Sequence, residues 1–309
     1  MTKKLAIVFP GQGSQSVGML ADLYQNYPLV QDTFNEASAA LGYDLWALIA
    51  NGPEEQLNET QRTQPALLTA SVAVWRLWQQ QGGATPAYFA GHSLGEYSAL
   101  VCAGVLSLAD AVKLVEKRGN YMQQAVPAGV GAMSAVIGLD DAAIAVACEQ
   151  AAQGEVVSPV NYNSPGQVVI AGHKAAVERA GELCKAAGAK RALPLPVSVP
   201  SHCALMRPAA EKLAADLAAL NFNPAVIPVV NNVDVVTTND AAAIKDALVR
   251  QLYSPVRWTE TIEWLAAQGV TDVLELGAGK VLSGLVKRIN KELTTGSVGD
   301  VASLQAALS

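Results

Sequence analysis

Three segments of the chain share one pattern of hydrophobic and polar positions: a short apolar run, a glycine-rich turn, then a helix-forming stretch. They read LAIVF-PGQGSQ from residue 5, AYFA-GHSLGE from residue 87 and VLEL-GAGK from residue 273. Short apolar runs that feed helices through tight turns are typical of a parallel sheet covered by helices. We therefore predict such a sheet, with ligands bound at the carboxyl ends of its strands.

Longer segments have helical spacing. The stretch PALLTASVAVWRLWQQQG predicts a helix that begins near Pro65 and ends at Gly82. The stretch SLADAVKLVEKRGNYMQQAV predicts a second helix with Ser107 as its N-cap. After about Leu293 the pattern is weak, and we expect this tail to be partly disordered.

The middle of the chain alternates differently. Strand, helix, two strands, helix and strand are predicted in that order for GAMSAVIGL, DDAAIAVACEQAAQ, VVSPVNYN, GQVVIAGH, KAAVERAGELCKAAGA and RALPLPV. This βαββαβ order is the ferredoxin-like arrangement. The sequence thus predicts an α/β protein in which residues 1–126 and 198–309 form a large core and residues 127–197 an inserted ferredoxin-like subdomain.

Composition narrows the function. The chain has 309 residues, of which 51% are hydrophobic, and a net charge of −6, which argues against a nucleic-acid binder. The opening MTKKLAIVFPGQG has too short an apolar run for a signal peptide, and no stretch is long enough to span a membrane. The four cysteines lack metal-binding spacing. We expect a cytoplasmic protein with reduced cysteines and no bound metal.

The segment Gly91-His92-Ser93-Leu94-Gly95 fits the G-x-S-x-G pattern between a predicted strand and a predicted helix. A serine at such a turn has a strained backbone, so its neighbours must be small, and its hydroxyl is exposed. The N–H of the following residue then faces a developing oxyanion. We predict that Ser93 is a nucleophile; the alternative is an ordinary glycine-rich turn with a capping serine.

A nucleophilic serine needs a base, and the chain has three histidines, His92, His173 and His202. His92 adjoins Ser93 in a sharp turn, where neighbouring side chains point apart, so a structural or pocket-lining role is expected. His173 suits a turn between a strand and a helix. Elimination favours His202, and no acidic residue stands in a convincing loop to orient it. A backbone carbonyl could do so instead.

Arg118 falls on an apolar stripe of its predicted helix, together with Ala111, Val115 and Met122. An arginine there is costly unless a carboxylate or phosphate meets it. Its planar guanidinium suits a carboxylate bound through two hydrogen bonds. The spacing leaves two interpretations open: a ligand carboxylate, or a buried structural ion pair.

Six motifs in one order resemble the malonyl-CoA:acyl carrier protein transacylases of bacterial fatty-acid synthesis. They are FPGQGSQ near the N-terminus, TQPAL at 63–67, GHSLGEYSAL at 91–100, Arg-Gly at 118–119, SVPSH at 198–202 and QLYSPVRW at 251–258. The resemblance covers nearly the whole chain. It implies an α/β-hydrolase-like core with a ferredoxin-like insert. One departure is Ala278, where the family usually has proline between two glycines.

The resemblance also implies a role for each matching residue. Ser93 would be the acylated nucleophile and His202 its base, with the main-chain carbonyl of Gln251 orienting the imidazole. The remaining matches are the oxyanion-hole N–H groups of Gln12 and Leu94, the malonyl-carboxylate partner Arg118, and the pocket-lining residues Gln64 and Asn161. The implied reaction is ping-pong malonyl transfer from malonyl-CoA to holo acyl carrier protein, without a cofactor.

Both substrates are acidic, so local basic residues must dock the carrier protein. One candidate group lies in the helix predicted after the last strand and includes Lys287 and Arg288, with Lys280 and Lys291 nearby; a second comprises Lys185, Lys190 and Arg191. Ordinary solvated helix faces are the alternative.

Two functions from other classes compete. A serine esterase or thioesterase could use the same turn, and a conventional acid in the triad would favour it. A non-catalytic nucleotide-binding or scaffold protein could use the glycine-rich loops, but FPGQGSQSVG and GAGKVLSG both fail the phosphate-binding fingerprints. Within the family, a transacylase that loads a polyketide carrier protein would use the same residues.

Overall fold

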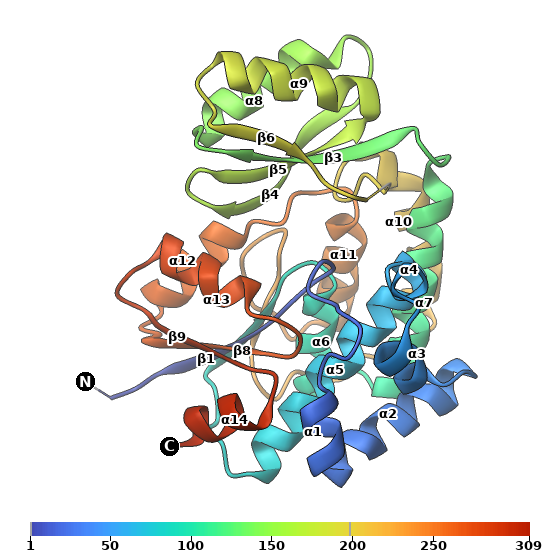
Figure 1. The fold of residues 1–309 in the computed structure, drawn as a ribbon, viewed down its shortest axis with the longest axis vertical. Coiled ribbons are helices and arrows are strands. Elements are labelled where there is room, and N and C mark those ends of the chain that lie inside the picture. Colours follow the sequence, from blue (N-terminus) through green and yellow to red (C-terminus); the bar gives the residue numbers. More distant parts are fainter. Residues whose placement is uncertain (1, 198) are drawn as a thin grey trace.

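Two sheets form the framework of the computed structural model, which describes residues 2–197 and 199–309 (Figure 1). The strands are β1 (Leu5–Phe9), β2 (Tyr88–Gly91), β3 (Gly131–Ile137), β4 (Val157–Ser164), β5 (Gln167–His173), β6 (Arg191–Pro194), β7 (Val229–Val230), β8 (Asp272–Leu276) and β9 (Thr294–Val298). The helices are α1 (Ala21–Asn26), α2 (Pro28–Leu41), α3 (Leu45–Asn51), α4 (Glu54–Leu57), α5 (Thr60–Gln80), α6 (Gly95–Cys102), α7 (Leu108–Ala125), α8 (Asp141–Ala152), α9 (Lys174–Ala186), the 3₁₀ turn η1 (Ala204–Met206), α10 (Arg207–Ala218), α11 (Ala241–Gln251), α12 (Trp258–Ala267), α13 (Val281–Ile289) and α14 (Val301–Leu308).

The larger sheet is parallel and has the strand order β7-β2-β1-β8-β9. In the central strand, Ile7 pairs with Phe89 of β2 on one side and with Leu274 of β8 on the other. β1, β2 and β8 are the three apolar runs that the sequence predicts as strands, and that prediction is confirmed. Their glycine-rich turns lie together at the carboxyl edge of the sheet, where ligands bind in such folds.

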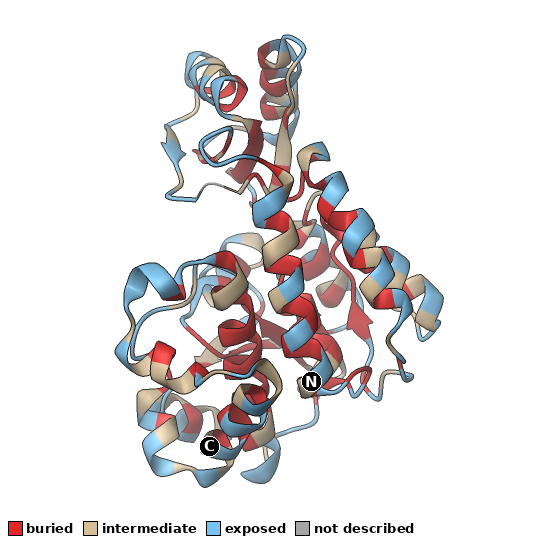
Figure 2. Ribbon diagram, turned by 90° about the vertical axis from the view of Figure 1, so that its right-hand side faces the viewer, coloured by how far each residue is buried: buried red, intermediate tan, exposed pale blue. Residues whose placement is uncertain are grey.

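Helices cover both faces of this sheet because β1 is apolar on both. Ile7 and Phe9 belong to a buried cluster that includes residues of α2, α5, α6, α7 and α10. Ala6 and Val8 belong to a second cluster with residues of α12 and α13. Figure 2 shows this burial along the strands and the inward faces of the helices. Each large apolar side chain buried this way stabilises the fold by about 1.5–3 kcal/mol.

The smaller sheet is antiparallel, with the order β4-β5-β3-β6, and its elements follow the chain as β3-α8-β4-β5-α9-β6. It lies at the top of Figure 1, with α8 and α9 on its outer side. β4 joins it to the loop before α12, since Val256 N donates to Val160 O at 2.8 Å and Tyr162 N donates to Val256 O at 3.0 Å. Asn161 of β4 is thereby held beside that loop.

Two local expectations fail and two hold. Pro65 lies inside α5, which begins at Thr60, so packing of a largely buried helix overrides the preference of proline for the first turn. The tail after Leu293 is ordered, as β9 pairs with β8 and α14 follows it. Ser107 caps α7 as predicted, its side chain accepting from Asp110 N. The four cysteines are free and buried.

Candidate active site

The turn after β2 has the strain that the glycine spacing predicts. Ser93 has φ 54°, in the left-handed region of the backbone that residues other than glycine rarely adopt. A Cβ on Gly91 would lie 1.9 Å from the carbonyl carbon of Gly95, and one on Gly95 would lie 2.1 Å from Phe9 O. Both neighbours of the turn must therefore be glycine, and Ser93 stands at its apex at the start of α6.

Ser93 meets His202 across 109 residues of sequence. The distance from Ser93 Oγ to His202 Nε2 is 2.7 Å, and the distance from His202 Nδ1 to the main-chain oxygen of Gln251 is also 2.7 Å. A proton on Nδ1 satisfies that carbonyl and leaves Nε2 free to accept the serine proton. Burial, aided by the positive charge of Arg118, lowers the pKa of His202 to about 3, so the imidazole is neutral at pH 7.

Arg118 is 1% exposed and reaches the same point. Its Nη1 donates to Gln64 Oε1 at 2.8 Å, while its Nη2 donates to Gln251 Oε1 at 2.8 Å and lies 3.4 Å from Ser93 Oγ. Within residues 2–197 and 199–309, no carboxylate forms an ion pair with it. Of the two interpretations from spacing, the structural ion pair is therefore excluded.

A cavity of about 360 Å³ connects these groups. Ser93, His202 and Arg118 line it from the core, and Met133 and Asn161 line it from the smaller sheet. The Asn161 Oδ1 atom is buried without a hydrogen-bond partner among the described residues. The cavity thus offers a nucleophile, a neutral base, an unpaired cation and a free acceptor.

Gln12 and Leu94, the predicted oxyanion donors, also line this cavity beside Ser93. The Gln12 side chain accepts a hydrogen bond from Thr60 Oγ1 at 3.0 Å, and Thr60 Oγ1 in turn accepts from Gln64 Nε2 at 3.0 Å. Gln64 itself is fully buried and is absent from the cavity lining, contrary to the expectation that it lines the pocket. It contacts Arg118 instead, because α5 and α7 pack side by side.

The other histidines lie as expected for supporting residues. His92 Nε2 is 2.7 Å from Asn163 Oδ1, and His92 lines the cavity wall. Burial lowers its pKa. His173 Nδ1 accepts from Val156 N at 2.9 Å at the turn into α9, outside the cavity. Neither histidine contacts Ser93 Oγ among the hydrogen bonds of the described chain.

Two buried residues at the site were missed by sequence reasoning. Asn232 Oδ1 accepts from Ser93 N at 2.8 Å, and its Nδ2 donates to Gly91 O at 2.7 Å. Glu96 accepts from Asn232 N at 2.8 Å and from Gln251 Nε2 at 2.7 Å. Burial raises the pKa of Glu96 to about 7, while these hydrogen bonds and the Arg118 charge oppose the shift. A carboxylate on an otherwise apolar helix was a signal for Glu96; Asn232 had none.

The basic residues proposed for docking lie away from the cavity lining. Lys287 and Arg288 are exposed on α13, and Arg288 Nη1 donates to Gln167 Oε1 of β5 at 3.1 Å. α13 was expected to follow the last strand, but β9 comes after it. In the second group, Lys185 pairs with Glu182 at 3.1 Å.

In the described part of the chain, no group of three or more His, Cys, Asp or Glu side chains is placed to hold a metal ion. None of its helices is long and apolar enough to cross a membrane.

The chain is similar in sequence to known acyl transferases. The acyl transferase domain family model matches residues 6–305. A malonyl CoA-acyl carrier protein transacylase of Salmonella typhimurium is 70% identical over 305 residues, covering 99% of both chains. Its counterpart in Escherichia coli K12 is 68% identical with the same coverage.

Solved structures agree with these relatives. An acyl carrier protein S-malonyltransferase crystal structure from Vibrio cholerae has a TM-score of 0.97 at 70% identity and covers 98% of this chain and 99% of that one. A malonyl-transacylase in complex with its type II PKS acyl carrier protein has a TM-score of 0.98 at 64% identity, covering 99% of both chains.

Proposed function

The chain belongs to the acyl transferase domain family, among the malonyl-CoA:acyl carrier protein transacylases, and we propose that it moves a malonyl group from malonyl-CoA to the phosphopantetheine thiol of holo acyl carrier protein. The proposed intermediate is a malonyl ester of Ser93. The observation that carries this proposal is the 3.4 Å approach of the buried, unpaired Arg118 to the Ser93 hydroxyl beside His202. A cation there selects an acyl group that ends in a carboxylate.

In the first half-reaction, His202 Nε2 takes the proton of Ser93 Oγ as that oxygen bonds to the thioester carbonyl carbon. The carbonyl oxygen becomes an oxyanion, which the backbone N–H groups of Gln12 and Leu94 stabilise. Collapse of the intermediate breaks the carbon–sulfur bond, and the departing coenzyme A sulfur receives the proton from His202. The products are coenzyme A and malonyl-Ser93.

In the second half-reaction, the phosphopantetheine thiol gives its proton to His202 and attacks the ester carbonyl. The oxyanion again forms between Gln12 and Leu94, and its collapse breaks the carbon–oxygen bond to Ser93. His202 returns the proton to Ser93 Oγ, which restores the enzyme. Only residues of the chain and the two substrates take part, so the proposal needs no cofactor.

Substrate selection follows from the electrostatics of the cavity. Arg118 is held by two amide oxygens, from Gln64 and Gln251, and neither neutralises its charge. A malonyl carboxylate would pair with the guanidinium, whereas an acetyl group would leave the charge buried and unpaired. We propose that Gln64 and Gln251 act by holding Arg118, and that Asn161 Oδ1 accepts a hydrogen bond from the substrate.

The competing esterase would use an acid to orient its histidine. Here the carbonyl of Gln251 takes that place, which favours the transacylase. The two are separated by intact-protein mass spectrometry after brief exposure to malonyl-CoA, with Ser93→Ala alongside. A malonyl adduct on the wild type alone, discharged faster by holo carrier protein than by water, supports transfer. An adduct lost to water without preference for the acceptor indicates a hydrolase, and no adduct refutes the proposal.

We propose that the exposed cations Lys287 and Arg288 meet the acidic carrier protein. Reversing both charges to glutamate should raise the carrier-protein KM and leave the rate of malonyl-adduct formation unchanged. Glutamate at Lys185 and Lys190, in the second basic group, is the matched control. A rise in KM in the control alone would assign docking to the second group instead.

The architecture supports a finer description. The strained nucleophile turn on a parallel sheet supports an α/β-hydrolase-like core, and the order β4-β5-β3-β6 supports a ferredoxin-like subdomain. We propose the division into residues 1–126 with 198–309 and residues 127–197. The boundary residue, Ser198, lies outside the described residues. The free, buried cysteines support a reducing, cytoplasmic setting.

A further inference from the structure

Glu96 is a buried acid that the proposed chemistry does not use. It lies in the first turn of α6 and is 2% exposed. Its Oε1 accepts from the main-chain N–H of Asn232, and its Oε2 accepts from Gln251 Nε2, at 2.8 and 2.7 Å. A buried carboxyl group costs folding free energy unless hydrogen bonds compensate it. Both of its partners touch residues of the reaction.

Gln251 connects Glu96 to the base and to the cation. Its main-chain oxygen faces His202 Nδ1, and its side-chain Oε1 accepts from Arg118 Nη2. Its Nε2 faces Glu96 and also donates to Ser93 O at 3.0 Å. An amide group can turn over and exchange its oxygen and nitrogen. In its carboxylate form Glu96 has only acceptor oxygens, so it keeps the amide nitrogen on its own side and the amide oxygen faces Arg118.

Asn232 connects Glu96 to the nucleophile. Its side chain bonds the start and the apex of the strained turn, donating to Gly91 O and accepting from Ser93 N. Its main-chain N–H is held by Glu96. One acid therefore holds two segments, the loop that carries Asn232 and the end of α11 that carries Gln251.

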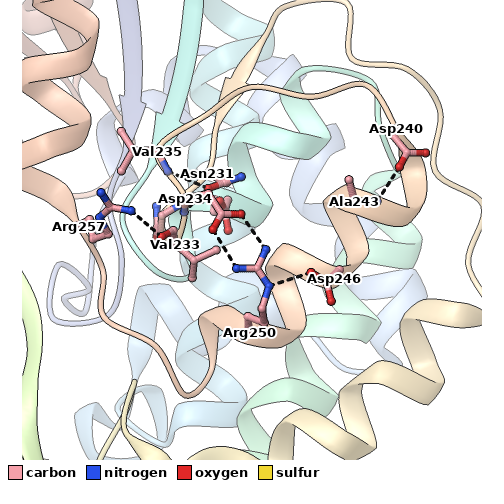
Figure 3. A network of polar contacts seen from close by, with 11 residues as sticks. Asn231, Val233, Asp234, Val235, Asp240, Ala243, Asp246, Arg250 and Arg257 are labelled. Carbon is pink, nitrogen blue, oxygen red and sulfur yellow. Dashed lines mark hydrogen bonds and ion pairs between the residues drawn. The ribbon is translucent and has the colours of Figure 1, made fainter.

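A second contact ties the same two segments together from the solvent side (Figure 3). Arg250 precedes Gln251, and Asp234 follows Asn232 by two residues. Arg250 Nη1 and Nη2 donate to the two carboxylate oxygens of Asp234 at 2.9 and 2.7 Å, and Arg250 Nε donates to Asp246 Oδ2 at 2.7 Å. This paired geometry fixes orientation as well as distance.

We propose that Glu96 is a positioning residue for acyl transfer: acting through Asn232 and Gln251, it aligns Ser93, His202 and Arg118, and the Asp234–Arg250 pair supports the same alignment from outside. The inference rests on the proposed function. It predicts that both the rate of transfer and the preference for a carboxylate-bearing acyl group depend on a residue that touches neither substrate.

The first test is Glu96→Gln, assayed at pH 8, above the pKa of about 7 that burial gives the wild-type carboxyl group. Glutamine has the same shape but offers one acceptor to two N–H donors, so the Gln251 amide or Asn232 must move. We expect kcat for malonyl transfer to fall about 10- to 100-fold, because displacements on the order of 1 Å cost up to about 100-fold. The malonyl-to-acetyl ratio of kcat/KM should fall as well.

A merely structural role would lower the thermal stability of Glu96→Gln and leave kcat per folded molecule and the acyl preference unchanged; that result overturns the proposal. Should this variant fail to fold, Arg250→Ala decides. The Asp234–Arg250 pair is partly exposed, with 33% and 42% of the arginine and aspartate side chains accessible, so its loss costs little stability.

Arg179→Ala is the matched control for Arg250→Ala. Arg179 is 32% exposed and pairs with Glu155 at 2.7 Å, but it lies on α9, on the outer side of the smaller sheet. We expect Arg250→Ala to lower kcat about 2- to 30-fold and Arg179→Ala to leave kcat unchanged. Equal kcat values in the two variants would refute the positioning role. Malonyl-adduct formation by the wild type is measured alongside, and its absence would instead refute the proposed function.

Discussion

Replacing Arg118 with alanine tests the basis of substrate selection most directly. The guanidinium is 1% exposed, and its hydrogen-bond partners at the site, the Gln64 and Gln251 amides and the Ser93 hydroxyl, are all neutral. A malonyl carboxylate is therefore its only charged partner in the proposed reaction. Arg118→Ala removes the guanidinium that would pair with this carboxylate and leaves the Ser93–His202 pair in place.

The expected magnitude follows from burial. Removing one member of a buried ion pair costs about 3–5 kcal/mol, which corresponds to about a 10²- to 10⁴-fold loss in kcat/KM for malonyl-CoA. Acetyl-CoA never pairs with Arg118, so its kcat/KM should stay the same or rise once the unpaired charge is gone. Selectivity should thus fall by at least about 100-fold.

The assay measures kcat/KM for the transfer of the malonyl and acetyl groups from their coenzyme A thioesters to holo carrier protein. Mass spectrometry monitors formation of the acyl adduct on Ser93. Arg118→Lys is the matched variant, because it keeps the charge and loses the planar, two-pronged geometry. Its malonyl-to-acetyl ratio of kcat/KM should lie between those of the wild type and Arg118→Ala. An unchanged malonyl-to-acetyl ratio in folded Arg118→Ala would refute the reasoning.

Three further outcomes follow from the same contacts. Gly95→Ala should lower the free energy of unfolding in urea by about 1–3 kcal/mol or more, because its Cβ would lie 2.1 Å from Phe9 O. Gly284→Ala is the control: a Cβ there meets open space in α13, so the free energy of unfolding should rise by about 0.5–1 kcal/mol. Equal effects of the two substitutions would contradict the steric argument. NMR titration should find the His202 imidazole neutral down to pH 5, because its pKa is lowered to about 3. The free energy of unfolding should decline as pH falls below about 6.5, because the histidine of the unfolded chain then binds a proton and that of the folded chain does not. A titration midpoint near 6.5 in the folded protein would contradict this. Burial raises the pKa of Glu275 to about 8, so this group contributes stability below pH 4.5 that is lost as pH rises toward 8. In thermal unfolding, Glu275→Gln should therefore show a smaller fall in stability between pH 5 and pH 9 than the wild type. An identical fall in both proteins would contradict the raised pKa of Glu275.

Local sequence determined the nucleophile turn. An apolar strand, glycine at 91 and 95 and a following helix leave one backbone path, and steric contacts within a few residues enforce it. The helix cap at Ser107 and the apolar stripe that holds Arg118 are likewise set by neighbouring residues. The three apolar strands of the larger sheet and the βαββαβ order of the smaller one could be predicted, because periodicity reports which face of an element is buried, whereas β7 and β9 were not predicted.

Two failed expectations show the limit of local rules. Pro65 was expected near the start of a helix, yet α5 continues through it because most of that helix packs into the core. The tail after Leu293 has little pattern of its own, yet β9 gains its hydrogen bonds from β8. In both cases a distant partner supplied the stabilising contacts.

The tertiary structure alone decided how the site is assembled. His202 could be chosen by elimination, but its 2.7 Å contact with Ser93 joins residues 109 positions apart. Spacing could bury Arg118 but could not exclude an ion pair, since that depends on what α5 and α11 bring beside it. Asn232 had no local signature, and the place of Glu96 on an apolar helix did not reveal its partners, because a hydrogen bond between distant segments leaves no periodic trace in either. Sequence determines the backbone path of each element through local sterics and burial, whereas long-range packing determines which polar groups meet.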